Sequence, residues 1–312
     1  MATIKKPGRI GLSRSLPFYC IMIAWPVLQF CVFYIGVNLN SILLAFKDFG
    51  LSQTEYTWSF DNFRLWLDFS NSSYGAYIPK AMVVSLKAYA ISLMVGLPLG
   101  LFFSYYIFKK LPMSGFFRVV LFIPTIVSSI VLVSMYRLFV NNVAFELAQR
   151  WGLVSLKADP FLDSSDTRFA TMMVYNVFVS FGTSVLMYSN KMSTISPEII
   201  ESAQLDGAGA LKEFFHIVFP MAFSTVSVFL ITGIAGIFTN QINNFAFFAA
   251  TPKAYDETRT IGYLLYHMTR HAGQNDWEYP PIAALGILLT LIVLPLTFLA
   301  RYCFERFGPS EE

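Results

Sequence analysis

Stretches without Asp, Glu, Lys or Arg dominate this sequence and alternate with short charged segments. Six of them are long enough for a helix of about 20 residues, the length that crosses a bilayer core of ~30 Å. The spans predicted from them are 15–44, 82–108, 119–138, 169–190, 217–244 and 279–301. The fifth stretch, 214–252, would reach about 58 Å as a single helix, so part of it must lie outside the membrane or the helix must be broken.

The composition agrees with a membrane protein. Of the 312 residues, 55% are hydrophobic and 13% are charged, whereas soluble domains carry about 25% charged residues. The same numbers exclude a disordered chain. We therefore predict an all-α, polytopic membrane protein with one transmembrane domain, residues 15–307, between tails at 1–14 and 308–312. Cys20, Cys31 and Cys303 lie in or beside the spans, which favours neither a disulfide framework nor a thiolate metal site.

Basic residues indicate the orientation. The N-terminal tail contains Lys5, Lys6, Arg9 and Arg14 directly before the first span. Lys and Arg favour the cytoplasmic side, and with six spans both ends lie on the same side, so both termini are predicted to be cytoplasmic. The first span is far longer than the ~7–15-residue core of a cleavable signal peptide and is predicted to be retained.

The loop before the fifth span, 191–220, contains signals for a helix, a turn and a second helix. Ser196 and Pro197 are typical of a helix start, and Gly207 is placed to end that helix. A second amphipathic segment follows, up to Pro220, which is predicted to open the fifth span. The loop thus presents small and apolar residues where a simple connection would be polar, and such exposed apolar surface usually indicates a partner.

Within this loop the sequence resembles the EAA motif of ABC-importer permeases. The matching residues are Glu201, Ser202, Ala203, Asp206, Gly207, Ala208, Ile217 and Pro220. The spacings from Ala203 to Gly207 and from Gly207 to Ile217 fit the motif in full, while Ser202 replaces its second Ala and Phe219 replaces its Leu. The resemblance implies the type I permease fold of ABC importers, with six transmembrane helices.

In that family the motif forms the coupling helix, which occupies a cleft of the ATPase subunit. For this chain the resemblance implies that Gly207 gives the turn and that Glu201 and Asp206 pair with basic groups of the ATPase. The sequence contains no Gly-Lys dipeptide and hence no P-loop. We therefore predict a transport subunit and not an enzyme. The chain is expected to bind no cofactor, and ATP and Mg²⁺ are expected to be used by the partner ATPase.

A second resemblance lies at the end of the fifth stretch. Residues 236–245 are similar to the N-x-N-N-F stretch in the first permease subunit of maltose-type sugar importers, and residues 258–266 to a T-x-T-L-x-x-x-I-Y segment of the same subunits. Ala250, Thr251 and Pro252 stand where these subunits usually have Gly-Gly-Gly-Pro. The departure leaves the subclass open, but the resemblance implies a carbohydrate substrate.

The amide side chains of this segment lie in a stretch without charges. Lipid cannot satisfy their donors and acceptors, so we expect them to face protein or a wet cavity. Amides beside aromatic rings suit a sugar, whereas packing between helices is the alternative. The predicted substrate path comprises Asn240, Gln241, Asn243, Asn244, Phe245 and Phe247, with Tyr175, Asn176 and Phe178 of the fourth span as further candidates. On a continuous helix Asn240 and Asn244 would share one face with Phe247, and this argument fails if the helix breaks at Thr239.

Other functions fit the sequence less well. Ion-coupled carriers and channels usually need Asp, Glu or His within the spans, and the six stretches contain no acidic residue. An intramembrane enzyme would need a motif such as HExxH or GxSxG, and both are missing. His267 and His271 have a spacing that two metal ligands on a helix can have, but no third ligand follows at a reliable spacing, so no metal site is predicted.

The resemblance therefore implies the first-type permease of a binding-protein-dependent ABC importer for a carbohydrate, in a bacterial cytoplasmic membrane. The expected partners are a second, non-identical permease subunit, two ATPase subunits, an extracytoplasmic solute-binding protein and membrane lipid. No run of basic residues indicates nucleic acid. Polyamines and glycerol phosphodiesters are carried by related permeases and stay open, although a cationic substrate would favour acidic residues that the spans lack.

Overall fold

The structure is a computed structural model that describes the chain except for residues 1–11, 50–54, 69–76, 249–255, 275 and 310–312. Lys5, Lys6 and Arg9 of the predicted tail and the segment 250–252 lie outside the described residues. The chain forms two compact units, one of Met1–Leu65 with Ala272–Ile287 and one of Trp66–His271 with Leu288–Glu312. The single domain predicted for 15–307 stays a prediction.

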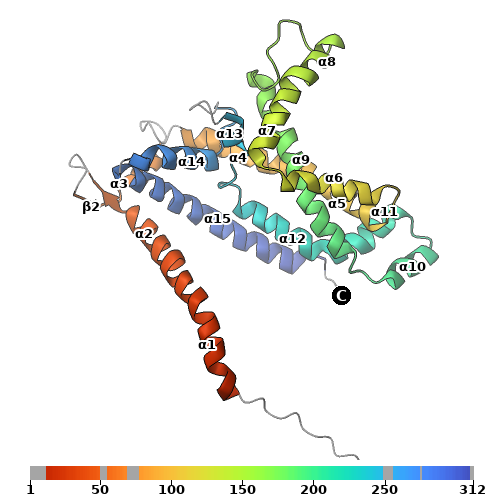
Figure 1. Cartoon of the computed structure of the whole chain (residues 1–312), viewed down its shortest axis with the longest axis horizontal. Helices are drawn as coiled ribbons and strands as arrows, with labels where there is room; N and C mark the ends of the chain where they lie inside the picture. Colours follow the sequence, from red (N-terminus) through yellow and green to blue (C-terminus); the bar gives the residue numbers. More distant parts are fainter. Residues whose placement is uncertain (1–11, 50–54, 69–76, 249–255, 275, 310–312) are drawn as a thin grey trace, which may run out of the picture. The chain divides into compact units, whose positions relative to one another are not determined.

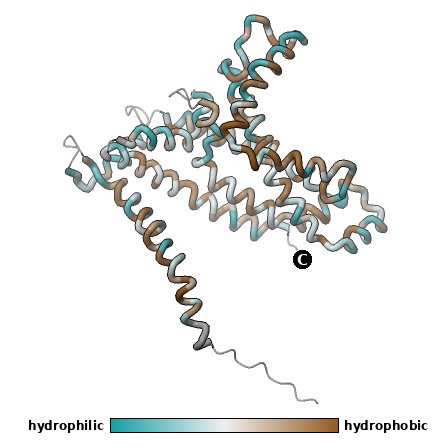
Figure 2. Tube along the Cα trace, viewed as in Figure 1, coloured by the Kyte–Doolittle hydropathy of each residue, from teal (hydrophilic) through white to brown (hydrophobic). Residues whose placement is uncertain are grey.

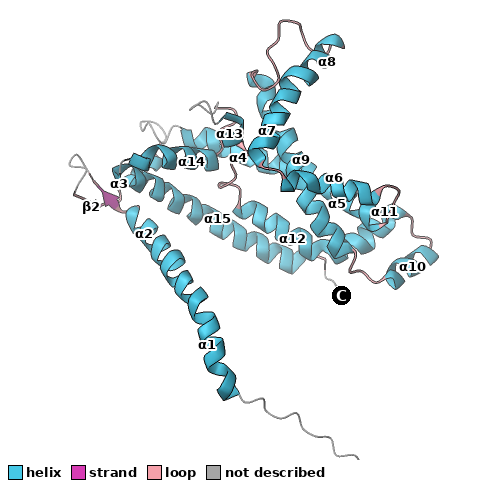
Figure 3. Ribbon diagram, in the orientation of Figure 1, coloured by secondary structure: helices cyan, strands magenta, loops and turns pink. Residues whose placement is uncertain are grey.

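The described part of the chain is mostly helical (Figure 3), as its composition predicts. In the smaller unit, α1, the π-helical η1 and α2 follow one another directly, and a short antiparallel pair of strands lies before α3. The buried amide of Asn62 stabilises this end, because it donates to the carbonyl oxygens of Ala45 and Lys47 at 3.0 and 2.8 Å. The elements are α1 Leu12–Gln29, η1 Phe30–Gly36, α2 Val37–Leu44, β1 Lys47–Asp48, β2 Thr57–Trp58, α3 Asp61–Leu67, η6 Ala272–Gln274, η7 Asp276–Glu278 and the start of α15 Tyr279–Phe307.

In the larger unit α9 is the central helix, and α5, α6 and α12 pack against it. Figure 1 shows α5 and α9 running side by side. Gly182 permits the close approach of α6, because a Cβ atom at this position would overlap the backbone carbonyl oxygen of Leu121. The elements are α4 Ile78–Ile91, η3 Ser92–Gly96, α5 Leu97–Phe108, α6 Ser114–Ile126, α7 Ser129–Leu138, η4 Phe139–Ala144, α8 Phe145–Arg150, α9 Ser165–Met192, α10 Pro197–Leu205, α11 Ala210–Glu213, η5 Phe214–Val218, α12 Phe219–Ala235, α13 Asn244–Phe248 and α14 Ile261–His271.

Among the groups of buried apolar side chains in the larger unit, two join segments that are far apart in the sequence. One includes Val133 of α7, Met172 of α9 and Phe247 of α13. The other includes Leu101 of α5 and Ile200 of α10, together with residues of α9, η5 and α12. Since Ile200 lies in the loop 191–220, this loop is packed onto the long helices and does not hang free from them.

Six helices of the described chain are long and apolar enough to cross a membrane, and Figure 2 shows hydrophobic residues (brown) along them. They are Pro17–Leu44, Ile78–Phe108, Ser129–Arg150, Ser165–Met192, Ala210–Ala235 and Tyr279–Phe307. The number agrees with the sequence analysis, and four of the predicted spans coincide with these helices. The third and fifth do not.

The third predicted span, 119–138, coincides with no single helix. α6 ends at Ile126, Val127 and Ser128 are extended, and a new helix begins at Ser129. The long apolar helix here is Ser129–Arg150. The charge-free stretch ends before Arg137, so the helix that continues to Arg150 could not be recognised from it. Pro124 inside α6 lacks the N–H that would bond a carbonyl oxygen of the preceding turn, which weakens the helix before it ends at Ile126.

The fifth predicted span, 217–244, is displaced toward the N-terminus. One helix runs from Ala210 to Ala235 without a break at Pro220, because the π-helical segment η5 precedes it and relieves the clash of the proline ring with the preceding turn. The helix ends at Ala235, and Gly236 is its C-cap. The prediction that the fifth stretch cannot be one straight helix is confirmed.

Candidate functional site

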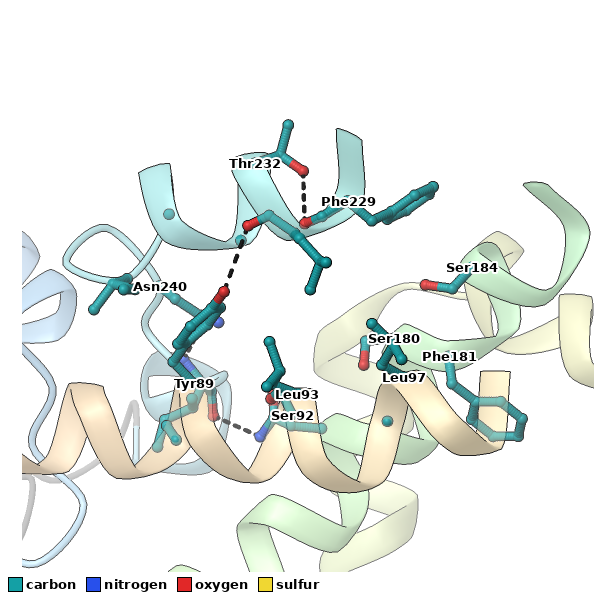
Figure 4. Close-up of a pocket in the computed structure, with 18 of the residues that line it drawn as sticks. Tyr89, Ser92, Leu93, Leu97, Ser180, Phe181, Ser184, Phe229, Thr232 and Asn240 are labelled. Carbon is teal, nitrogen blue, oxygen red and sulfur yellow. Dashed lines mark hydrogen bonds between the residues drawn. The ribbon is translucent and has the colours of Figure 1, made fainter. Parts of the chain in front are cut away.

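A cavity of about 430 Å³ lies inside the larger unit, between α4, η3, α9 and the end of α12 (Figure 4). Residues of these elements and of the segment that follows α12 surround it. The lining comprises Ser85, Ala88, Tyr89, Ser92, Leu93, Gly96, Leu97, Asn176, Ser180, Phe181, Ser184, Tyr188, Phe229, Leu230, Thr232, Gly233, Gly236, Ile237, Thr239, Asn240, Ile242 and Thr260. Its size is within the range of ~300–1,000 Å³ that is usual for small-molecule sites.

The lining mixes hydroxyl and amide groups with apolar side chains and carries no charge. None of its residues is Asp, Glu, Lys, Arg or His. The hydroxyl groups of Ser180 and Thr232 donate to carbonyl oxygens of their own helices at 3.2 and 2.8 Å, and that of Tyr89 donates to Leu230 at 3.4 Å. Each hydroxyl oxygen therefore keeps lone pairs that can accept a hydrogen bond from a ligand.

A tight turn after α12 forms one wall of the cavity. Ile242 and Asn243 have φ angles of 45° and 56°, the left-handed region that Asn tolerates better than most residues. The Asn240 side chain accepts a hydrogen bond from the backbone N–H of Ile242 at 2.8 Å, which closes the turn. Asn176 of α9 binds the turn from the other side. Its Nδ2 donates to the carbonyl oxygen of Ile242 at 3.0 Å, and its Oδ1 accepts from Asn243 at 2.7 Å.

This turn changes the roles of the predicted amides. Asn240 and Asn176 line the cavity, while Asn243 holds the turn to α9. Asn244 is fully buried, donates to the carbonyl oxygen of Thr258 at 2.7 Å and does not line the cavity. The inference of a shared helical face for Asn240 and Asn244 is wrong, because α12 ends at Ala235 and α13 begins only at Asn244.

The predicted aromatic residues also lie outside the lining. Phe247 is fully buried and packs edge-to-face against Tyr175, with ring centroids 5.3 Å apart. Phe245 packs against Tyr266 at 5.2 Å, and the ring of Phe178 is 6.1 Å from that of Phe181. Gln241 is half-buried and does not line the cavity. The assignment of these residues to a substrate path stays a prediction.

Most of the lining was missed from the sequence. The sequence pattern that indicates the cavity is a set of hydroxyl residues within apolar helices. Ser180 and Ser184, one turn apart on α9, belong to this set. Gly233 also belongs to the lining, and a Cβ atom there would lie 2.9 Å from the ring of Tyr89. Small residues thus leave the space into which the tyrosine extends.

The coupling loop, residues 191–220, folds locally much as its sequence predicts. α10 begins at Pro197, although the side chain of Ser196 makes no capping hydrogen bond. Gly207 has a φ of +77°, which glycine adopts without strain. Its N–H donates to Gln204, and the N–H of Ala208 donates to Ala203, both at 3.0 Å. These two bonds form a Schellman motif, the usual way for a glycine to end a helix.

The exposed face of the loop contains large apolar side chains beside polar and charged ones. Leu205, Leu211 and Phe215 are 89%, 76% and 60% exposed, and Glu201, Ser202 and Asp206 are also exposed. Ala203 is buried within the chain itself, so it does not lie on the outer face. Ala208, Ile217 and Pro220 are half-buried. Exposed side chains of this size on a short, rigid helix and turn are suited to contact with another protein.

On α14 the Nε2 atoms of His267 and His271 lie 3.0 Å apart. Among the described residues, no group of three or more His, Cys, Asp or Glu side chains could hold a metal ion.

Comparison with known protein sequences finds relatives that are permeases, and two of them are described here. YurN of Bacillus subtilis (strain 168), a probable ABC transporter permease protein, is 30% identical over 129 residues, which are 40% of this chain and 44% of YurN. AraP of the same strain, an arabinooligosaccharides transport system permease protein, is 25% identical over 213 residues, which are 67% of this chain and 66% of AraP. The matches thus span less than two thirds of the length of either relative.

A solved structure has the same fold. It is the crystal structure of a bacterial alginate ABC transporter in complex with an alginate pentasaccharide-bound periplasmic protein. The TM-score is 0.76, with 95% of this chain and 96% of that chain covered at 19% identity. This likeness confirms the predicted fold of an ABC-importer permease.

The model of one protein family, described as binding-protein-dependent transport system inner membrane component, matches residues 92–309. The matched part includes the cavity helices η3, α9 and α12 and the whole coupling loop. The resemblance seen in the EAA-like residues is confirmed: this chain belongs to the family of binding-protein-dependent transport system inner membrane components.

Proposed function

We propose that this chain is a permease subunit of an ATP-driven importer and forms half of a path for a neutral carbohydrate, most simply an oligosaccharide. The observation that carries the proposal is the uncharged cavity with its hydroxyl, amide and aromatic lining. Sugar hydroxyls exchange hydrogen bonds with such groups, and the C–H faces of a sugar ring pack against aromatic side chains.

The absence of charge from the lining supports a neutral substrate over a charged one. A polyamine would require carboxylates, and a glycerol phosphodiester or a uronic-acid sugar would require cations, because a buried charge without a partner is costly. None of the lining residues offers either. Relatives include a permease for arabinooligosaccharides and a transporter of alginate, and the lining favours a neutral sugar like the first.

The partners follow from the family and from the exposed surfaces. We expect a second, non-identical permease to complete the path, an extracytoplasmic solute-binding protein to deliver the sugar, and two ATPase subunits to use ATP and Mg²⁺. The exposed apolar side chains of Leu205 in α10 and Leu211 in α11 form the surface that we assign to the ATPase. In this arrangement the coupling loop and both termini lie on the cytoplasmic side.

Uptake into proteoliposomes that contain the whole complex tests the proposal. Arabinotriose and maltotriose serve as neutral probes, an alginate trisaccharide as the acidic probe and spermidine as the cationic probe. We expect ATP-dependent uptake of a neutral probe only. Asn240→Ala should reduce it at least fivefold, since a lost hydrogen bond costs about 1 kcal/mol, whereas the matched change Asn142→Ala on the exposed surface of η4 should not. Uptake of the alginate trisaccharide or of spermidine alone would contradict the proposal.

A further inference from the structure

Glu213, in the short helix α11, is a buried carboxylate, whereas Glu146, Asp166 and Glu305 of the other long apolar helices are exposed or lie at helix ends. It is 1% exposed. The Nζ atom of Lys109, at the C-terminal end of α5, lies 2.5 Å from Oε1 and 2.7 Å from Oε2 of this carboxylate. The two residues are more than a hundred positions apart, so the ion pair joins the end of α5 to the first turn of the long helix Ala210–Ala235.

Two neutral side chains complete the surroundings of the carboxylate. The hydroxyl group of Tyr105, one turn before Lys109 on α5, lies 3.1 Å from Oε1 and donates to it. The amide of Gln204, near the end of α10, donates to Oε2 at 3.3 Å. The carboxylate therefore accepts hydrogen bonds from both α5 and the coupling helix α10, and we call these four residues, Tyr105, Lys109, Gln204 and Glu213, the carboxylate tie.

The carboxylate tie connects the exposed coupling face to the cavity wall. α5 begins at Leu97, which lines the cavity together with Gly96, and ends at the tie. α10 carries Leu205, exposed on the opposite side of the tie. Apolar contacts strengthen the same junction, because the rings of Tyr105 and Phe214 lie 5.1 Å apart.

A gain in folding stability alone does not explain why Lys109 and Glu213 form a buried ion pair here. A buried ion pair is often no more stabilising than apolar residues of the same size, because both charges lose their hydration. What the charges provide is a defined geometry, since a displaced carboxylate would leave a buried ammonium group without a partner. Such a junction resists the sliding of one helix along the other.

We propose that Glu213 is a positioning residue that ties α5 to the coupling helix, so that a displacement of α10 by the ATPase moves the cavity wall with it. The inference rests on the part of the proposed function in which an ATPase drives α10. The fifth span receives the displacement directly through the chain, whereas α5, far away in sequence, receives it through the carboxylate tie.

The distance between spin labels on α10 and α5 tests this inference. The labels replace Glu198 on α10 and Phe102 on α5, both exposed, after Cys20, Cys31 and Cys303 have been changed to Ser. The whole complex with its ATPase subunits is measured without nucleotide and with Mg-ATP and vanadate. In the complex without tie substitutions, the mean distance and the width of its distribution should stay unchanged, because the two helices move together.

Glu213→Gln and Lys109→Met should release α5. In these complexes Mg-ATP and vanadate should shift the mean distance by roughly 2 Å or more, or broaden the distribution about twofold, as expected for helices that slide separately. Lys109→Arg keeps the charge and should restore the unchanged distance. Lys110→Met is the matched control next to Lys109, and Glu146→Gln on the exposed surface of α8 is the control for the carboxylate.

A merely structural role would give a different result. A variant that only loses stability would copurify less ATPase, whereas assembled Glu213→Gln complexes should hydrolyse ATP within about twofold of the unsubstituted rate, since no group of the ATPase site is changed. Unchanged distances in Glu213→Gln, a moving distance in the unsubstituted complex, or an equal shift in Lys110→Met would each overturn the inference. The distance measurement uses Mg-ATP and vanadate but no sugar. A complex that imports none of the sugar probes would therefore refute the proposed substrate, and the measured distances would still test the role of Glu213.

Discussion

Replacing Asn176 by Ala should loosen the turn that forms one wall of the cavity. The substitution removes two hydrogen bonds between α9 and the turn, one to the carbonyl oxygen of Ile242 at 3.0 Å and one from Asn243 at 2.7 Å. At about 1 kcal/mol for each bond, the turn loses roughly 2 kcal/mol of local stability, which corresponds to an approximately 30-fold higher population of the open turn.

Hydrogen exchange of the backbone amides in residues 236–248 measures this population directly. Asn190→Ala is the matched control, because Asn190 lies on the same helix but accepts its hydrogen bond from Arg118 at the exposed surface, at 2.9 Å. Exchange in 236–248 should rise in Asn176→Ala and stay unchanged in Asn190→Ala. Equal exchange in Asn176→Ala and the unsubstituted protein would refute the role that we assign to Asn176, whatever the effect on uptake.

Three further changes test other parts of the structure. Gly207→Pro should abolish uptake with normal amounts of chain in the membrane, because proline cannot adopt the φ of +77° and lacks the N–H that donates to Gln204; normal uptake would contradict this role of the turn. Gly182→Ala should lower the melting temperature in detergent by several degrees, since an overpacked helix contact costs about 1–3 kcal/mol, and an unchanged melting temperature would argue against the tight α6–α9 contact. Gly100→Ala, whose added Cβ atom would lie 3.5 Å from the Tyr188 ring, should be neutral or stabilising, and a large loss of stability would contradict that packing.

The coupling loop was predictable because its signals are local. Pro197 at the start of α10 and Gly207 after its end act through the backbone of their own neighbours, so spacing alone gives the helix and the turn. The number of long apolar helices was predictable for a similar reason, since it depends on runs of composition. The third span is the exception. Its charge-free stretch ends before Arg137, whereas the helix continues past this charge to Arg150.

The cavity and the carboxylate tie depend on contacts between distant segments. Asn176 and Asn243 bond to each other across more than sixty positions, and nothing in the neighbourhood of either residue indicates its partner. Lys109 directly follows the predicted span 82–108 and Glu213 lies in the loop 191–220, and only the packing of α5 against this loop brings their charges together. By contrast, the end of α12 has a local signal, because Gly236 follows it directly and glycine commonly ends helices.

The π-helical segment η3 has a consequence for how this chain can change during evolution. A π turn holds one residue more than the α-helical turn that it replaces. Loss of one residue within Ser92–Gly96 would therefore convert the segment to a regular helix, and the side chains of α4 and α5 would keep their present contacts with the neighbouring helices. The same deletion within α5 would rotate every later side chain of that helix by about 100° and turn Tyr105 and Lys109 away from Glu213. In alignments of related chains, single-residue gaps should accordingly fall within this segment and avoid the helix that follows it.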